Sequence, residues 1–569
     1  ARKCMVLRRF RLHEVITLMK KFISEVISPR RAWLRAAMLA VCGAVAGLCI
    51  TFPTYAGAFL QWFAYIPAAW VLFSMSRDEA RLPRLLWRAY GYGFLFFMAE
   101  YLVNYHWFFS FYPLDFTGMS RASAAVVVAV AWIGLSFLAS IAGGFVFLLF
   151  VLAARGGTAK RAPIVLPFAG GALFAVFEWV ETIGWMGVPW GRAALGQLAF
   201  DSSPTVQIAS VLGSYAVTFL IVTFSFLLAQ AAISGRRGAM IRSSVAVLLA
   251  AADIVFGAVM LCVPENGRQI KVAAIQGNVS SRDKFQISSA ETVAIYEKLI
   301  REAAASGAQL IVTPESAFPW DLGRDEKNLG VFRSIAHDYG VSIVLGHLEG
   351  IRDEQENVLA LMYPDGSISD VRYSKRHLVP FGEYMPWRGF LSTVIPPLAE
   401  ISMLEYDIKA GSGTEIMTLA DGTRVGGLIC FDSIYEELAL ASVRDGAEIL
   451  LLGTNDSWFS DSAAVYMHNA QSRLRAVETG VPVVRAANTG ISSLTDARGR
   501  VHGTLPPLVD GALCGTLTIG SASFYSRTGN IFVYLLIAFS LGTILSGAAL
   551  TLSSRKKEKE KACASADRV

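Results

Sequence analysis

The chain has 569 residues, of which 54% are hydrophobic and only 17% are charged. A mean hydropathy of +0.46 is too high for an ordinary soluble protein of this length, so the composition predicts a membrane protein. The net charge of +6 does not indicate nucleic-acid binding, because the basic residues lie beside apolar segments, where membrane topology accounts for them. The cysteines have no paired CxxC spacing, so we expect neither a zinc site nor any other metal.

Eight segments are apolar and long enough to cross a bilayer, whose hydrocarbon core of about 30 Å takes roughly 20 helical residues. They lie at 32–51, 55–76, 88–110, 122–153, 162–181, 207–234, 243–263 and 529–552. The fourth segment is unusually long, and we expect one extended helix because no polar turn divides it. The first segment is expected to be an uncleaved anchor, since no small-residue cleavage site follows it.

Lys and Arg concentrate in alternate connections between these segments, which predicts the orientation of the chain. The basic stretches are 1–31, the connections after the second, fourth and sixth segments, and the tail 553–569. These basic stretches are expected to be cytoplasmic. The chain would then consist of a membrane domain with seven helices at 32–263, an outward-facing domain at 264–528 and an eighth transmembrane helix at 529–552.

The 264–528 segment has the pattern of an α/β domain. Short apolar runs rich in β-branched residues alternate with helical stretches, of which 289–305 has apolar residues at helical spacing along one face. The runs lie near 271–275, 309–313, 341–345, 426–430, 448–452 and 481–485. Continuous apolar strands are typical of sheets that are buried on both faces, so we expect a layered α/β domain.

Cys430 is a candidate nucleophile within this domain. It ends an apolar strand and precedes a polar, helix-starting segment, where backbone amide groups could stabilise a thiolate and later an oxyanion. Two alternatives remain open at this point. The residue could be a buried structural thiol, or it could form a disulfide with Cys514, the other cysteine of the 264–528 segment.

Glu315 and Lys375 could complete an acyl-transfer site around Cys430. Glu315 follows Pro314 at the end of another apolar strand, where it could be a general base or merely a helix cap. Lys375 could stabilise an oxyanion, although a solvated surface lysine is the alternative. His377 could also be proposed as a base for the cysteine, but nothing around it supports that role and we expect it to be structural.

The settings of these residues resemble those of the nitrilase superfamily, whose members use a Glu-Lys-Cys triad in an αββα sandwich. The ordered set of motifs over nearly the whole chain is similar, more specifically, to the apolipoprotein N-acyltransferase family. These motifs are Gly187-Val-Pro-Trp-Gly, Gln276-Gly-Asn, Val312-Thr-Pro-Glu, Tyr373-Ser-Lys-Arg-His, Gly427-Leu-Ile-Cys-Phe-Asp, Asn455-Asp-Ser-Trp-Phe and Arg485-Ala-Ala-Asn-Thr-Gly. Each motif is weakly specific by itself, whereas the ordered set is highly specific.

The resemblance implies a fold and a reaction. It implies a multi-span helical membrane domain joined to a nitrilase-like αββα sandwich, in the bacterial inner membrane, with both termini cytoplasmic and the catalytic domain periplasmic. An acyl chain would pass from a phospholipid to a Cys430 thioester and then to the N-terminal amino group of a diacylated apolipoprotein, without a cofactor. The alternative is a membrane-tethered amidase or nitrilase that hydrolyses the acyl-enzyme with water.

Further residues receive roles from the resemblance and from their settings. Glu383 is expected to orient Lys375. The candidate substrate contacts are Gln276, Asn278, Trp387, Asp432, Trp458 and Phe459. The family commonly has Glu at the position of Asp432 and often Trp at that of Phe285, so the substrate contacts of this chain could differ. The apolar segment 387–404 is expected to be a lid or arm near the membrane rather than part of the core.

Overall fold

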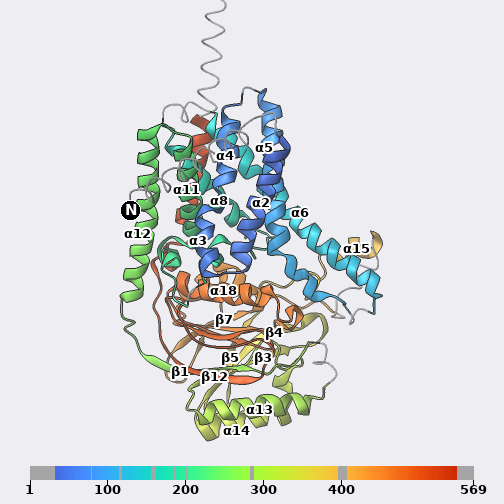
Figure 1. Cartoon of the computed structure of the whole chain (residues 1–569). Coiled ribbons are helices and arrows are strands. Elements are labelled where there is room, and N and C mark those ends of the chain that lie inside the picture. Colours follow the sequence, from blue (N-terminus) through green and yellow to red (C-terminus); the bar gives the residue numbers. More distant parts are fainter. Residues whose placement is uncertain are drawn as a thin grey trace, which may run out of the picture.

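The computed structural model describes residues 32–78, 80–114, 118–155, 162–184, 187–199, 201–281, 287–394 and 406–546. The predicted terminal segments 1–31 and 553–569, Phe285, and residues 395–404 of the predicted lid lie outside these ranges. A bundle of helices stands on an α/β domain, and the chain returns to the bundle after that domain (Figure 1). Both halves of the predicted fold class are therefore present.

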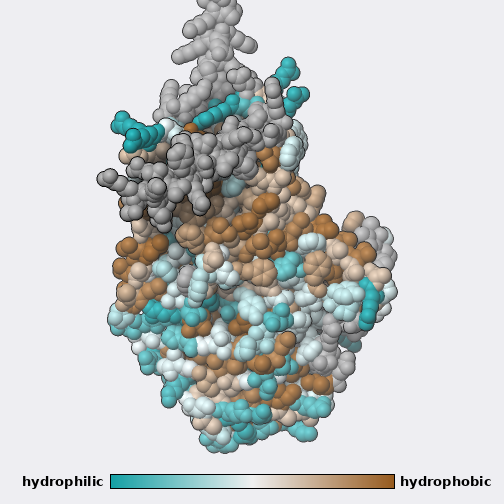
Figure 2. All heavy atoms as spheres, viewed as in Figure 1, coloured by the Kyte–Doolittle hydropathy of each residue, from teal (hydrophilic) through white to brown (hydrophobic). Residues whose placement is uncertain are grey.

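The helical bundle is built from long apolar helices. Its main elements are α2 (Ala32–Thr51), α3 (Tyr55–Ala64), α4 (Ile66–Ser76), α5 (Leu82–Asn104), α6 (Arg121–Ala154), α8 (Val165–Val180), α11 (Ser214–Ala232), α12 (Arg236–Cys262) and a helix at Ile531–Ser546. Within the described ranges, five helical segments are long and apolar enough to cross a membrane, with 55–76 taken as one. Hydrophobic side chains cover the visible face of the bundle, whereas hydrophilic ones prevail on the α/β domain (Figure 2).

Three predicted segments are interrupted in the structure. The 88–110 segment divides at Tyr105, between α5 and the short helix η1 (His106–Phe111), and the other two divide for local reasons. The 55–76 segment divides at Tyr65, just before Pro67, which has no backbone N–H to donate to the preceding turn. The 207–234 segment divides at Gly213, where φ is +79° and an added Cβ would lie 2.6 Å from the ring of Tyr525. In contrast, α6 is one helix of 34 residues, as expected. The number of membrane crossings stays a prediction.

The α/β domain contains two six-stranded sheets packed face to face. In spatial order, the first sheet consists of β12 (Gly511–Thr518), β1 (Gln269–Gln276), β2 (Leu310–Val312), β3 (Ser342–Glu349), β4 (Glu356–Met362) and β5 (Ile368–Ser374). The second consists of β11 (Val501–Leu505), β10 (Ser492–Thr495), β9 (Val483–Ala487), β8 (Ile449–Thr454), β7 (Arg424–Ile429) and β6 (Met417–Thr418). The apolar side chains between the sheets form one core, as continuous apolar strands require.

Helices cover the outer faces of both sheets, which completes the expected αββα sandwich. The helices α13 (Ser289–Ala305) and α14 (Glu326–Tyr339) lie on the first sheet, farthest from the bundle (Figure 1). The predicted helix 289–305 is α13, and it begins with a capping box between Ser288 and Glu291. The other two helices, α17 (Glu436–Arg444) and α18 (Ala463–Thr479), lie between the second sheet and the bundle.

The layer of α17 and α18 joins the two parts of the molecule. One continuous cluster of buried apolar side chains includes residues of the bundle helices, of α17 and α18, and of β8. Of the 17 residues of α18, 15 are buried, because this helix is covered by the sheet on one side and by the bundle on the other. The bundle therefore forms the outer wall of the layer directly behind β7 and β8.

Candidate active site

Three strand ends converge at one edge of the sandwich. Glu315 follows β2, Lys375 follows β5, and Cys430 follows β7. The first two residues are buried, with 6% and 1% of their surface exposed, and Cys430 is partly exposed. The surface-lysine alternative for Lys375 is therefore wrong. The hydrogen bonds of the sheets hold the backbone at these strand ends, so the side chains that follow them start from well-defined positions.

Glu315 is held by donors on both carboxylate oxygens. Its Oε1 accepts hydrogen bonds from Lys375 Nζ at 2.8 Å and from Asn357 Nδ2 at 2.9 Å. Its Oε2 accepts from the backbone N–H of Asn455 at 2.9 Å. These contacts span both sheets and do not cap a helix, so the helix-cap alternative is wrong. They fix the position of the carboxylate beside the cysteine.

Lys375 lies between two carboxylates. Its Nζ is 2.8 Å from an oxygen of Glu315 and 2.8 Å from an oxygen of Glu383. Burial opposes the charge of the ammonium group, but Glu315 and Glu383 outweigh it and raise the pKa of Lys375 well above its usual value. Glu383 is itself positioned by the backbone N–H of Val379 at 2.9 Å. The lysine is thus a permanent cation at neutral pH.

Cys430 adopts a strained backbone at the turn between β7 and the short helix η6 (Cys430–Ile434). Its φ is +48°, in the left-handed region that few residues other than glycine adopt. Burial raises the pKa of the Cys430 thiol, and the nearby Glu315 carboxylate raises it further, while Lys375 acts in the opposite direction. These surroundings therefore favour the neutral thiol of Cys430.

Asp432 connects the Lys375 segment to the Cys430 turn. It is fully buried and accepts hydrogen bonds from the backbone N–H groups of His377 at 2.7 Å and Ile429 at 3.0 Å. The hydroxyl of Tyr373 donates to it at 2.9 Å. These protein groups occupy both carboxylate oxygens of Asp432, so the geometry favours a positioning role. A direct substrate contact by Asp432 stays a prediction.

The other predicted substrate contacts fall into two groups. Gln276 and Asn278 bind the 506–509 turn, since Gln276 Nε2 donates to Pro506 O at 2.8 Å and Asn278 Nδ2 to Leu508 O at 3.1 Å. Trp458 and Phe459 lie in η7 (Ser457–Phe459), where the ring of Phe459 packs on aromatic rings of the bundle. Trp387 is 64% exposed and precedes α15 (Arg388–Val394).

Two alternatives from the sequence are resolved by the structure. Cys430 and Cys514 are both free thiols, with Cys514 on β12 of the opposite sheet, so the disulfide alternative is wrong. The ring of His377 stacks on Tyr435, with 4.0 Å between centroids, and its Nε2 lies 3.2 Å from Glu437. This placement agrees with the expected structural role of His377.

Sequence reasoning missed several polar residues that support the site. Asn357 bridges Glu315 and Glu383, with a distance of 3.4 Å to the latter. Its only signal was a polar residue at the start of an apolar strand. Buried Asp456 and His468 lie close to Cys430, and ligand atoms of the three residues fall within 4.8 Å of one another. Arg485 binds Asp456 at 2.6 Å, and its charge would repel a metal ion there.

Two family models match the two parts of the chain. The carbon-nitrogen hydrolase family matches residues 271–526, and the family described as apolipoprotein N-acyltransferase N-terminal domain matches residues 28–227. An amidase from Nesterenkonia sp. has 18% sequence identity and a TM-score of 0.36, covering 48% of this chain and 97% of its own.

Curated relatives match nearly the full length. The apolipoprotein N-acyltransferase of Geobacter metallireducens is 33% identical over 90% of this chain and 94% of its own. The apolipoprotein N-acyltransferase of Allorhizobium ampelinum is 30% identical over 86% of this chain and 91% of its own. With both regions matched in order and with relatives of this similarity, the chain belongs to the apolipoprotein N-acyltransferase family.

Proposed function

We propose that this protein transfers an acyl chain from a phospholipid to the N-terminal amino group of a diacylated apolipoprotein, through a thioester on Cys430. The observation that carries the proposal is the buried Lys375 ammonium between Glu315 and Glu383, beside a neutral thiol. A fixed base and a fixed cation around a protonated thiol are the groups that acyl transfer through a thioester needs. The membrane helices add the setting in which both lipid substrates occur.

The first half of the reaction forms the thioester. Glu315 accepts the Cys430 proton as Sγ attacks the carbonyl carbon of a phospholipid ester, and Lys375 stabilises the oxyanion that develops. The ester C–O bond then breaks, and the lysophospholipid leaves with the proton from Glu315. Because both carboxylate oxygens of Glu315 are already held by donors, little reorganisation is needed when the proton moves.

The second half transfers the acyl chain to nitrogen. The amino group of the diacylglyceryl-cysteine attacks the thioester carbonyl, and Lys375 again stabilises the oxyanion. The C–S bond breaks, the amine loses a proton to Glu315, and the proton returns to the Cys430 sulfur. Thioesters react readily with amines, so this step requires neither a nucleotide nor a metal ion.

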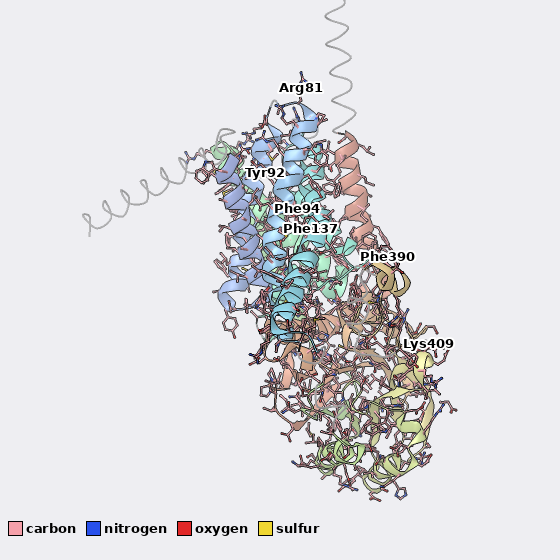
Figure 3. The ribbon with its side chains drawn as sticks, turned by 90° about the vertical axis from the view of Figure 1, so that its right-hand side faces the viewer. Arg81, Tyr92, Phe94, Phe137, Phe390 and Lys409 are labelled. Carbon is pink, nitrogen blue, oxygen red and sulfur yellow. The ribbon has the colours of Figure 1, made fainter. Side chains whose placement is uncertain are left out.

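The lipid supply is supported by the surface around the site. Trp387 and Phe390 are 64% and 63% exposed, so this part of the predicted lid is not packed into the core. Phe390 lies at the top of the α/β domain, near the lower ends of bundle helices (Figure 3). Large exposed aromatic side chains at this level fit contact with the bilayer interface, from which a phospholipid would enter.

The proposal is tested by the mass of the full-length protein after incubation with vesicles of a phospholipid of known acyl composition. We expect Cys430 to gain one acyl chain, which a diacylated lipopeptide then removes as an N-acylated product. Cys430→Ala should not be acylated, whereas Cys514→Ala, which removes another free thiol of the domain, should behave as the wild type. Release of free fatty acid instead of the N-acylated product would support the hydrolase alternative.

We infer further that the protein is in the bacterial inner membrane, with the α/β domain in the periplasm. Arg81 lies at the end of the bundle away from that domain, and basic residues favour the cytoplasmic side (Figure 3). In spheroplasts, an impermeant maleimide should label Asp365→Cys, in an exposed turn of the α/β domain, but not Arg81→Cys, when Cys262 and Cys514 have been replaced by serine. The reverse labelling pattern would overturn this orientation.

A further inference from the structure

His468 contacts the Cys430 turn and is not part of the group formed by Glu315, Lys375 and Glu383. It is 1% exposed and lies on α18, with Nε2 3.1 Å from the carbonyl oxygen of Cys430 and 2.9 Å from the hydroxyl of Ser433. The Ser433 hydroxyl donates to the same carbonyl at 2.7 Å. Two polar side chains, those of His468 and Ser433, therefore contact the carbonyl of Cys430, whereas the carbonyl groups of the preceding strand are hydrogen-bonded within the sheet.

The orientation of the His468 ring is fixed by a buried ion pair. Nδ1 lies 2.8 Å from Asp456 Oδ1, and Asp456 Oδ2 accepts from Arg485 Nη2 at 2.6 Å. Burial opposes the charge of Asp456, but Arg485 and His468 outweigh it and lower its pKa to about 2, so it is ionised at neutral pH. Nδ1 must therefore carry the hydrogen of this contact, which leaves Nε2 directed at the Cys430 turn.

A second path connects the same ion pair to the sulfur. The Thr454 hydroxyl donates to Asp456 Oδ1 at 3.2 Å and also hydrogen-bonds the Cys430 side chain. Thr454 ends β8, which is parallel to β7 and adjacent to it. Both the carbonyl and the sulfur of Cys430 are thus connected to Asp456, one through His468 and the other through Thr454.

This arrangement fits the strain at Cys430. A residue other than glycine at a φ of +48° is held there only when its surroundings outweigh the strain of that conformation. The hydrogen bonds from His468 and Ser433 to the turn supply such a restraint. Nε2 lies within hydrogen-bond distance of both groups, so it can donate to the Cys430 carbonyl or, if the Ser433 hydroxyl turns toward the ring, accept from that hydroxyl.

The bundle closes this network from outside. The ring of Trp190, from the loop before α9 (Ala193–Gly196), packs on the His468 imidazole with 5.6 Å between centroids. Nearby on α18, Gln471 Nε2 donates to the carbonyl of Pro189 at 3.0 Å. The imidazole therefore lies between the catalytic turn and a loop of the membrane domain, where it has no room to rotate.

We propose that His468 is a positioning residue that, oriented by Asp456 and Arg485, holds the Cys430 turn in the conformation from which Sγ attacks the acyl donor. The inference rests on the proposed role of Cys430 as nucleophile. His468 takes no proton from the substrate and touches no reacting atom. Its removal should slow acylation of Cys430 without weakening the binding of phospholipid.

The test compares His468→Leu and His468→Gln in the full-length protein. Leucine fills much of the ring volume without polar atoms, whereas the glutamine amide can still donate to Cys430 or accept from Ser433. We expect His468→Leu to lower kcat for acyl-enzyme formation by about 10- to 100-fold with KM within about twofold, as a small misplacement of the nucleophile does. We expect His468→Gln to recover most of that loss.

His347→Leu is the matched control, because His347 is also buried in the same domain, with 5% of its surface exposed, but lies on β3 beside Leu322 and Leu329. It should lower the melting temperature to a similar extent while kcat stays within about twofold. Equal kcat losses for His468→Leu and His468→Gln, or for His468→Leu and His347→Leu, would overturn the inference.

Alkylation of Cys430 by iodoacetamide separates this inference from the proposed function. If the wild type formed no thioester from phospholipid, the proposed function would fail. The alkylation rates would still test positioning, since His468→Leu should react more slowly than His468→Gln and His347→Leu. If His468→Leu does not fold, the same comparison is made between His468→Gln and His468→Asn, whose shorter amide cannot reach the Cys430 turn and should react more slowly.

Discussion

Residue charges around Cys430 do not balance. One ammonium group, Lys375, faces two carboxylates, Glu315 and Glu383, so the site carries an excess of one negative charge before substrate enters. Burial and then the Glu315 carboxylate raise the pKa of the Cys430 thiol, and Lys375 offsets them only in part, so a resting thiolate is disfavoured. Lys375 should stay between its two partners, because a buried cation that loses an anion is left with an uncompensated charge.

Glu315→Gln should therefore slow acyl transfer but speed the alkylation of Cys430. Acyl transfer should fall by at least about 100-fold, since the base is lost. The thiol pKa should fall, because a carboxylate that raises it is removed while Lys375 remains. At pH 9, alkylation by iodoacetamide should accordingly be faster in Glu315→Gln than in the wild type. A slower reaction at that pH would show that the Glu315 charge does not control the thiol.

Glu383→Gln tests whether Lys375 needs both carboxylates. The amide oxygen can still accept from Nζ, so the lysine should stay in place, but one charge that raises its pKa is lost. We expect kcat to fall by about 10- to 100-fold, as for the loss of one group that supports an oxyanion stabiliser. Glu354→Gln, in an exposed pair with Lys409, is the matched control and should leave kcat unchanged. Equal activity of both variants would contradict the role of Glu383.

The sequence could predict part of this site and not the rest. Glu315, Lys375 and Cys430 are recognisable because each follows a strand in a characteristic setting, and strand ends in a layered domain meet at an edge. Asn357, Asp456 and His468 have no such setting. Their partners come from other sheets or helices, so their meaning depends on the tertiary packing that brings α18 beneath β7 and β8.

Elements of the two domains are joined by a buried network of charges. Arg192, in the loop after α8, binds Glu436 at the start of α17 at 2.6 Å, and Arg475 binds Glu478 within α18 at 2.8 Å. Burial opposes the charge of Glu436, but Arg192 and Arg475 outweigh it and lower its pKa. The backbone N–H of Ser214, the first residue of α11, donates to Glu478 at 3.0 Å. The network therefore fixes α17, and with it the turn of Cys430, against the bundle.

Arg192→Met should destabilise this connection strongly. Removing one partner leaves Glu436 with a buried charge that is only partly compensated, at a cost of about 3–5 kcal/mol, whereas removing both partners is nearer to neutral. We expect the melting temperature in detergent to fall more in Arg192→Met than in the double variant Arg192→Met/Glu436→Leu. Arg333→Met, which breaks the exposed pair with Glu326 on α14, is the control and should change it little. A lower melting temperature in the double variant would contradict the expected coupling.

Element boundaries show where hydropathy stops being informative. The length of α6 follows directly from an uninterrupted apolar run. The N-terminal ends of α4 and α11 cannot be read from hydropathy, because Pro67 and Gly213 are single residues within segments that remain apolar. At Gly213 the backbone must turn to let Tyr525, from the far end of the chain, pack against it. A hydropathy value averaged over a window of sequence carries no information about the contact between Gly213 and Tyr525.

Across the whole molecule, one hydrophobic cluster extends from the bundle into the helical layer over the second sheet. The sequence indicates two domains of different composition, and Figure 2 shows the corresponding change of surface. The sequence does not reveal that both faces of the second sheet are covered. The helices over that sheet are buried on both sides, and the same apolar cluster runs from α2 to α18. Domain boundaries in the sequence are therefore not boundaries of the core.

The α/β domain should consequently depend on the bundle for its stability. If residues 264–528 were expressed alone, α17 and α18 would expose the face that packs against the membrane helices, together with Arg475 and Glu478. An apolar face of this size, with buried charges that lose their partners, favours aggregation. We expect the isolated domain to aggregate or to bind a hydrophobic dye, measured by size-exclusion chromatography and fluorescence. A monodisperse domain with the melting temperature of the full-length protein would show that the sandwich folds independently and that the shared core is only a docking surface.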